Sequence, residues 1–199
     1  MSCHNNLQFN LKTGDLLFQD LDSSPLCDAI EKVTSGYKNL PISHIGIVLK
    51  ENNKTYVIEA YEGVDTITIE KFLDRNKYNG HPKVFVGRLK TKHNHLIPKA
   101  IDRGIQLIGK KYDEEFAPDN DKFYCSELIY EMFMYSNENL PFFKLKPMTY
   151  KFQGKTLEVW SDYFDKLNIE IPENKLGINP ACISLSDKIE IIYNYNLPS

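Results

Sequence analysis

Ser43-His-Ile-Gly-Ile-Val-Leu49, followed by Lys54-Thr-Tyr-Val-Ile-Glu-Ala60, is the most informative part of the chain for its architecture. Both runs are apolar and rich in β-branched residues, a pattern typical of buried β-strands. Asn52 and Asn53 lie between them and favour a turn, because asparagine tolerates the left-handed backbone conformation. The two runs therefore predict an antiparallel hairpin.

The rest of the chain adds further strands and several helices. Short apolar or alternating runs predict strands at 15–19, 64–69, 83–89 and 188–193. Ser24-Pro25 opens a helix, since serine caps a helix and proline fits its first position. Helical spacing of apolar residues predicts more helices at 97–108, within 121–136 and at 157–167, while residues 177–186 are expected to form a loop. We therefore expect a single α+β domain over residues 11–199, preceded by a flexible segment at 1–10.

The composition describes a folded globular protein and argues against two broad classes. Hydrophobic residues make up 42% of the 199 residues and charged residues 26%, a balance typical of a chain that buries a core. The net charge is −3 and no basic run is longer than Lys110-Lys111, so we expect no nucleic acid as a partner. No stretch reaches the roughly 18 apolar residues of a membrane helix, so we expect no transmembrane segment.

The four cysteines Cys3, Cys27, Cys125 and Cys182 are too widely spaced for a zinc ribbon or a redox pair. The sequence therefore indicates neither a metal site nor a cofactor. Cys3 lies in a polar segment, as the lipid-bearing cysteine of a lipoprotein with a trimmed leader would. That interpretation favours a peripheral or lipid-anchored protein of the cell envelope or periplasm. The alternative is an incidental cysteine in a frayed terminus of a cytoplasmic protein.

His44 and Glu59 are polar residues inside the two apolar runs. A buried carboxylate is unfavourable without a partner, and an imidazole in a strand is either a hydrogen-bonded core residue or a base directed at a site. If the runs pair as a hairpin, Glu59 can lie across from His44, hold one ring nitrogen and favour the imidazolium. The simpler alternatives are a structural His44 and a solvated Glu59 at a sheet edge.

Cys125, in Phe123-Tyr-Cys-Ser-Glu-Leu-Ile-Tyr130, is placed in the first turn of a predicted helix. The free amide groups and positive dipole end of a helix N-terminus favour a thiolate and can stabilise an oxyanion. Cys125 also shares the apolar face of Leu128 and Ile129, where a cysteine often serves as a small core residue. Together with His44 and Glu59 it would supply nucleophile, base and orienting group.

The order of these residues resembles a known family. Gly14-Asp-Leu-Leu-Phe-Gln19, Ser43-His-Ile-Gly-Ile47, Ile58-Glu-Ala60 and Tyr124-Cys-Ser-Glu-Leu-Ile129 are similar to segments of the permuted papain-like amidases of YiiX/YaeF type, circularly permuted relatives of the NlpC/P60 cell-wall hydrolases. Gly109-Lys-Lys-Tyr-Asp113 and Gly177-Ile-Asn-Pro180 add to the resemblance, which extends from about Leu11 to the last strand. It implies a papain-like fold, with a central antiparallel sheet or barrel packed against helices.

The resemblance also implies a function and its residues. Cys125 would be the nucleophile, His44 the general base and then acid, and Glu59 the group that orients the imidazole. The expected substrate is a small molecule, peptide or acyl-amide, including cell-wall peptides, cleaved through an acyl-enzyme intermediate. Tyr124, Tyr112 and Gln19 are candidates to line the substrate pocket. Two alternatives stay open: a lipid acyltransferase or lipase on the same scaffold, and a non-catalytic module that binds peptidoglycan fragments or amino acids.

Overall fold

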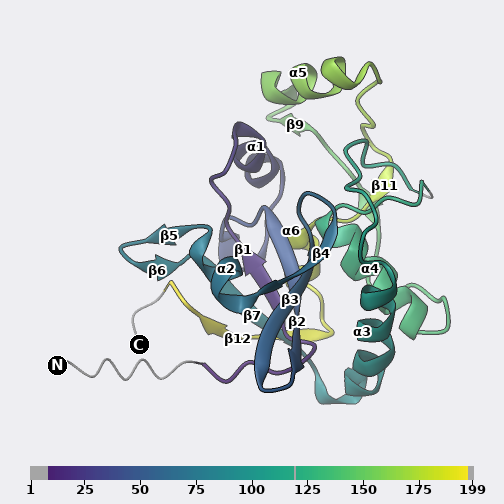
Figure 1. Cartoon of the computed structure of the whole chain (residues 1–199). Helices are drawn as coiled ribbons and strands as arrows, with labels where there is room; N and C mark the ends of the chain where they lie inside the picture. Colours follow the sequence, from purple (N-terminus) through teal and green to yellow (C-terminus); the bar gives the residue numbers. More distant parts are fainter. Residues whose placement is uncertain (1–8, 119, 197–199) are drawn as a thin grey trace.

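A computed structural model describes residues 9–118 and 120–196 of the chain (Figure 1). Its main feature is an antiparallel sheet with the strand order β12-β7-β1-β2-β3-β4. These strands are β1 (Leu16–Gln19), β2 (His44–Glu51), β3 (Lys54–Ala60), β4 (Val64–Thr68), β7 (Val84–Leu89) and β12 (Ile189–Asn194). The mixed α+β architecture and the central antiparallel sheet expected from the sequence are confirmed.

Three pairs of short strands lie outside the main sheet. They are β5 (Lys77–Tyr78) with β6 (His81–Pro82), β8 (Lys146–Pro147) with β11 (Leu176–Gly177), and β9 (Lys151–Phe152) with β10 (Lys155–Thr156). The β8–β11 pair joins segments that are distant in the sequence, and thereby brings the residues after β11 toward the start of helix α4.

Helices cover the sheet and extend beyond it (Figure 1). The α-helices are α1 (Pro25–Val33), α2 (Ile69–Asp74), α3 (Ile97–Gln106), α4 (Cys125–Ser136), α5 (Glu158–Leu167) and α6 (Pro180–Ser184), and the 3-10 helices are η1 (Tyr37–Asn39) and η2 (Thr91–Leu96). Helix α4 packs on β2 and β3, and α3 packs on α4. None of the helices in the described ranges is long and apolar enough to cross a membrane.

The predicted hairpin is present as β2 and β3, joined through Asn52 and Asn53, which both adopt the left-handed conformation. The strand predicted at 64–69 ends one residue early, since Ile69 begins helix α2, which Thr68 caps through its hydroxyl group. The loop expected at 177–186 is only partly correct, because α6 occupies its centre. Asn179 caps α6 and Pro180 opens it, a short-range signal that outweighs the loop-like composition.

Both faces of the sheet are covered. Helices α3 and α4 bury the face that carries Leu16, Ile45, Ile47 and Ile58, while α2 covers the opposite face with Phe72. A separate apolar cluster joins α1 to α5, and its buried members are Ala29, Tyr150, Trp160 and Phe164. The sheet therefore provides a rigid support for the candidate site, and the α1–α5 cluster forms a further apolar region.

The segment expected to be flexible, 1–10, falls mainly outside the described residues, as does Cys3. Phe9, which the structure does describe, stacks on Tyr193 of β12 with ring centroids 4.4 Å apart. The assignment of residues 11–199 to a single domain stays a prediction.

Candidate active site

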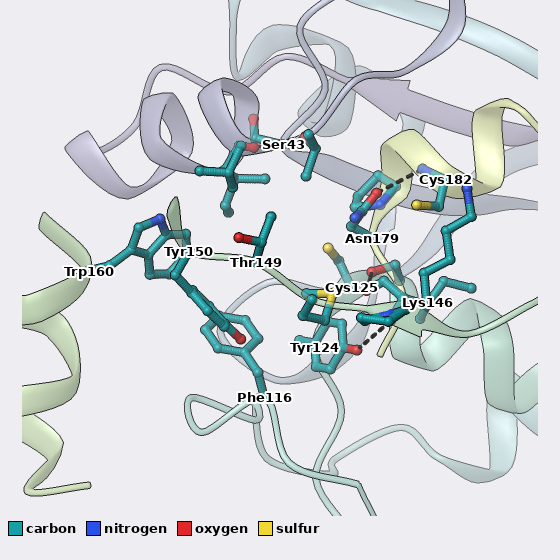
Figure 2. Close-up of a pocket in the computed structure, with 18 of the residues that line it drawn as sticks. Ser43, Phe116, Tyr124, Cys125, Lys146, Thr149, Tyr150, Trp160, Asn179 and Cys182 are labelled. Carbon is teal, nitrogen blue, oxygen red and sulfur yellow. Dashed lines mark hydrogen bonds between the residues drawn. The ribbon is translucent and has the colours of Figure 1, made fainter. Parts of the chain in front are cut away.

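Cys125 is the first residue of helix α4. Its backbone N–H belongs to the first turn, where helix geometry provides no intrahelical acceptor. The residue is 6% exposed, and Figure 2 shows its sulfur pointing into a cavity. Cys125 therefore lies at a helix N-terminus, as the sequence predicts, and its sulfur is directed into the cavity.

His44 and Glu59 are buried neighbours on β2 and β3. The residue paired with Glu59 in the sheet register is Gly46, so Glu59 reaches His44 along a diagonal rather than directly across the hairpin. The His44 Nε2 atom lies 2.7 Å from Oε2 of Glu59. Because this nitrogen is engaged with the carboxylate, the other ring nitrogen, Nδ1, is the one available to the Cys125 thiol.

Arg75, directly after α2, completes the environment of Glu59. Its Nη1 atom donates a hydrogen bond of 2.6 Å to Oε2 of Glu59, and Nη2 donates to Oε1. The guanidinium also lies over the ring of Tyr61, 4.2 Å from its centroid. Sequence reasoning missed Arg75 because a basic residue at the end of a short helix looks like an ordinary surface position.

The electrostatics of the buried group favour an ion pair. Burial by itself lowers the pKa of His44, but hydrogen bonds and charge from Cys125 and Glu59 outweigh it and raise the pKa to about 9. Burial would likewise raise the pKa of Glu59, yet His44 and Arg75 bring it below the usual value. At neutral pH this arrangement therefore holds a carboxylate against an imidazolium.

Asn179 is a second residue that the sequence analysis did not select. The backbone N–H of Ile178 donates to the Tyr124 hydroxyl at 3.2 Å, and the Ser126 hydroxyl donates to the Ile178 carbonyl at 3.0 Å. These two bonds fix the chain before α6 to the residues on either side of Cys125. The Asn179 Oδ1 atom accepts from the Cys182 N–H at 2.7 Å, and Asn179 lines the same cavity as Cys125 (Figure 2).

A cavity of about 270 Å³ opens beside Cys125 (Figure 2). Tyr112 and Tyr124 are both among the residues that line it, whereas His44, Glu59 and Gln19 are not. Gln19 is fully buried instead, and its amide donates to the Phe72 carbonyl at 2.8 Å. Of the proposed pocket residues, the two tyrosines thus line the cavity, whereas Gln19 lies in the sheet, paired with His44 in the register.

Within residues 9–118 and 120–196, no group of three or more His, Cys, Asp and Glu side chains is arranged to hold a metal ion.

Comparison with known proteins places these residues in a wider context. The sequence model of a family described as permuted papain-like amidase enzyme, YaeF/YiiX, C92 family, matches residues 10–193. A protein from Escherichia coli (strain K12), named uncharacterized protein YiiX, is 27% identical over 125 residues. That match covers 61% of this chain and 57% of the relative, so it spans little more than half of the relative's length.

A solved structure shares the fold. The crystal structure described as metalloprotein yiiX from Escherichia coli O157:H7 superposes with a TM-score of 0.74 at 20% sequence identity. The match covers 92% of this chain and 97% of the other. At this identity the likeness establishes the architecture, and the chemistry has to be argued from the residues of this chain.

Proposed function

The chain belongs to the permuted papain-like amidase family, and on that premise we propose that it is a cysteine-dependent hydrolase of amide or peptide bonds that acts through Cys125, His44 and Glu59. The observation that carries the proposal is the buried ion pair of His44 with Glu59, next to Cys125, which begins a helix and lines a cavity. The raised pKa of His44 supports an imidazolium at neutral pH, and such a charge favours the reactive thiolate form of a neighbouring cysteine.

The acylation step follows from this arrangement. The Cys125 sulfur attacks the carbonyl carbon of the substrate, and the carbonyl electron pair moves to the oxygen. The backbone N–H of Cys125 and the side-chain amide of Asn179 are suited to donate hydrogen bonds to that oxyanion. As the carbon–nitrogen bond breaks, the His44 imidazolium gives its proton to the departing amine, and a thioester of Cys125 remains.

In the hydrolysis of the thioester, His44 acts as a base instead of an acid. Neutral His44 accepts a proton from water, the oxygen attacks the thioester carbon, and the carbon–sulfur bond breaks to release the acid. Throughout, Glu59 holds the imidazole by Nε2 and stabilises its positive charge, and Arg75 keeps Glu59 ionised and fixed.

Acyl-enzyme formation tests this proposal. The purified protein is mixed with 4-nitrophenyl butyrate, an activated acyl donor, and its intact mass is followed over time. We expect a transient butyryl adduct, mapped by peptide mass spectrometry to Cys125, and its loss in Cys125→Ala. Cys182→Ala is the matched control, since Cys182 lines the same cavity, and should still form the adduct.

Two outcomes would contradict the proposal. One is turnover of the ester by Cys125→Ala at the wild-type rate, which would place the chemistry elsewhere. The other is binding of acyl-amides without any adduct or turnover, which would favour a non-catalytic binding module.

A further inference from the structure

The cavity beside Cys125 is apolar on one side and nearly free of charge. Its lining comes from α1, from the loop before α4 and the start of α4, from β8 and the segment after it, from α5, and from residues 178–182 around the start of α6. The apolar side chains that matter most are Ile30, Val33, Phe116, Met148, Tyr150 and Trp160. Among the described residues that line it, none is a carboxylate, and Lys146 is the one with a basic side chain.

The aromatic wall of the cavity is held rigidly. Tyr150 and Trp160 meet edge to face with centroids 4.9 Å apart, and both belong to the apolar cluster between α1 and α5. Figure 2 shows Phe116, Tyr150 and Trp160 on the side of the cavity opposite Asn179 and Cys182. A group bound to the Cys125 sulfur can therefore extend from the polar side toward this wall.

Hydrogen bonds on both sides of Phe116 hold its side chain at the cavity. Its φ angle of 51° is in the left-handed region, which is uncommon for a bulky residue. The fully buried Asp113 carboxylate accepts hydrogen bonds from the backbone of Glu115 at 3.0 Å and of Ala117 at 2.8 Å, on either side of Phe116. The loop is thereby held in the conformation that directs the Phe116 ring to Tyr124, at 5.3 Å between centroids.

The phenols at the cavity do not add charge. Burial raises the pKa of Tyr112, of Tyr124 and of Tyr150, so all three are neutral at physiological pH. A charged group placed against this wall would lose its hydration without gaining a partner, whereas an apolar group would gain from leaving water.

We propose that the cavity is an acyl-binding pocket selective for an uncharged, apolar acyl group, aliphatic or aromatic, carried by the carbonyl that Cys125 attacks. The proposal rests on the function proposed above and names the acyl half of its substrate. A cavity of about 270 Å³ accommodates an acyl group of roughly nine non-hydrogen atoms. This number takes for each atom about 30 Å³, the volume that one water molecule occupies in the liquid. The leaving amine would lie outside this pocket.

A series of 4-nitrophenyl esters tests the selectivity: acetate, butyrate, hexanoate, octanoate and dodecanoate, with 6-aminohexanoate and hydrogen succinate as charged members. Cys125 acylation is followed by release of 4-nitrophenol, and each rate is divided by that of the same ester with 2-mercaptoethanol. We expect kcat/KM to rise roughly fourfold per methylene up to about octanoate and then to level off or fall. Each charged ester should react at least tenfold more slowly than hexanoate.

A cavity-narrowing variant and a matched control complete the test. Val33 is partly buried at the end of α1, so Val33→Phe should reduce the cavity without disturbing the core. We expect the optimum to shift to shorter chains and the ratio of kcat/KM for octanoate to that for acetate to fall. Leu185→Phe introduces the same side chain at a position that is 54% exposed and away from the cavity, and should leave the profile unaltered.

The outcomes separate this inference from the proposed function. A flat chain-length profile, or equal rates for charged and uncharged esters, with Cys125 still acylated, would overturn the acyl pocket and leave the cysteine hydrolase standing. Failure of every ester to acylate Cys125 would refute the hydrolase itself.

Discussion

The Nε2 atom of His44 lies 2.7 Å from the Oε2 atom of Glu59, and both residues are almost completely buried. The two side chains meet diagonally across the β2–β3 hairpin, where the partner of Glu59 in the register is Gly46. Arg75 neutralises the carboxylate from the far side. Because Nε2 is engaged with the carboxylate, Nδ1 is the ring nitrogen of the buried imidazolium that is left for another partner.

This relationship predicts a dependence of stability on pH. The folded protein holds the His44 proton up to about pH 9, whereas the unfolded chain loses it near 6.5. The stabilisation is therefore complete below pH 6.5 and is lost as the pH rises through about 9. In urea unfolding, the free-energy difference between wild type and His44→Gln should shrink over that range, by at most about 3 kcal/mol. Parallel pH curves for the two proteins would contradict the raised pKa of His44.

Cys125 should react faster with an alkylating reagent than Cys182. At pH 6.5, iodoacetamide should alkylate Cys125 at least tenfold faster than Cys182, although Cys182 is more exposed. The physical reason is the imidazolium of His44 and the helix N-terminus beside Cys125, which favour the thiolate. Peptide mass spectrometry of samples quenched over time gives both rates. His44→Gln should abolish the difference; a wild-type protein in which Cys182 reacts first would refute the prediction.

Arg75→Gln should lower kcat without a comparable change in KM. It removes the charge that keeps Glu59 ionised and leaves the carboxylate free to reorient, so the imidazole is held less well. We expect a loss of roughly tenfold or more in kcat. Arg103→Gln is the control, because it breaks another Arg–Glu pair, Arg103 to Glu131 at 2.6 Å, away from the site. Equal kcat in the two variants would show that Arg75 serves stability alone.

Asn179→Asp separates the capping role of Asn179 from its proposed role as a donor to the oxyanion. Aspartate can still accept the Cys182 N–H and cap α6, but it cannot donate to an oxyanion. We expect kcat to fall roughly 10²-fold while the melting temperature stays near that of wild type. Asn179→Ser, which also caps without an amide donor, should behave in the same way. Full activity in both variants would exclude Asn179 from the oxyanion site.

Much of the architecture could be predicted from local sequence. The β2–β3 hairpin, α1 with Pro25 at its start, and the position of Cys125 at the head of α4 each depend on patterns within about ten residues. Periodicity and capping report such features directly. The sequence analysis missed helices α2 and α6, because helices of six and five residues are too short for a periodic signal.

The order of His44, Glu59 and Cys125 along the chain, with the resemblance it supports, was sufficient by itself to indicate the family and the candidate nucleophile. Only the tertiary structure decided what surrounds them. Arg75 reaches Glu59, Asn179 lies beside Cys125, and Phe116 joins Trp160 in the cavity wall because elements distant in sequence pack together. Such contacts depend on long-range register and loop closure, and no local pattern encodes them.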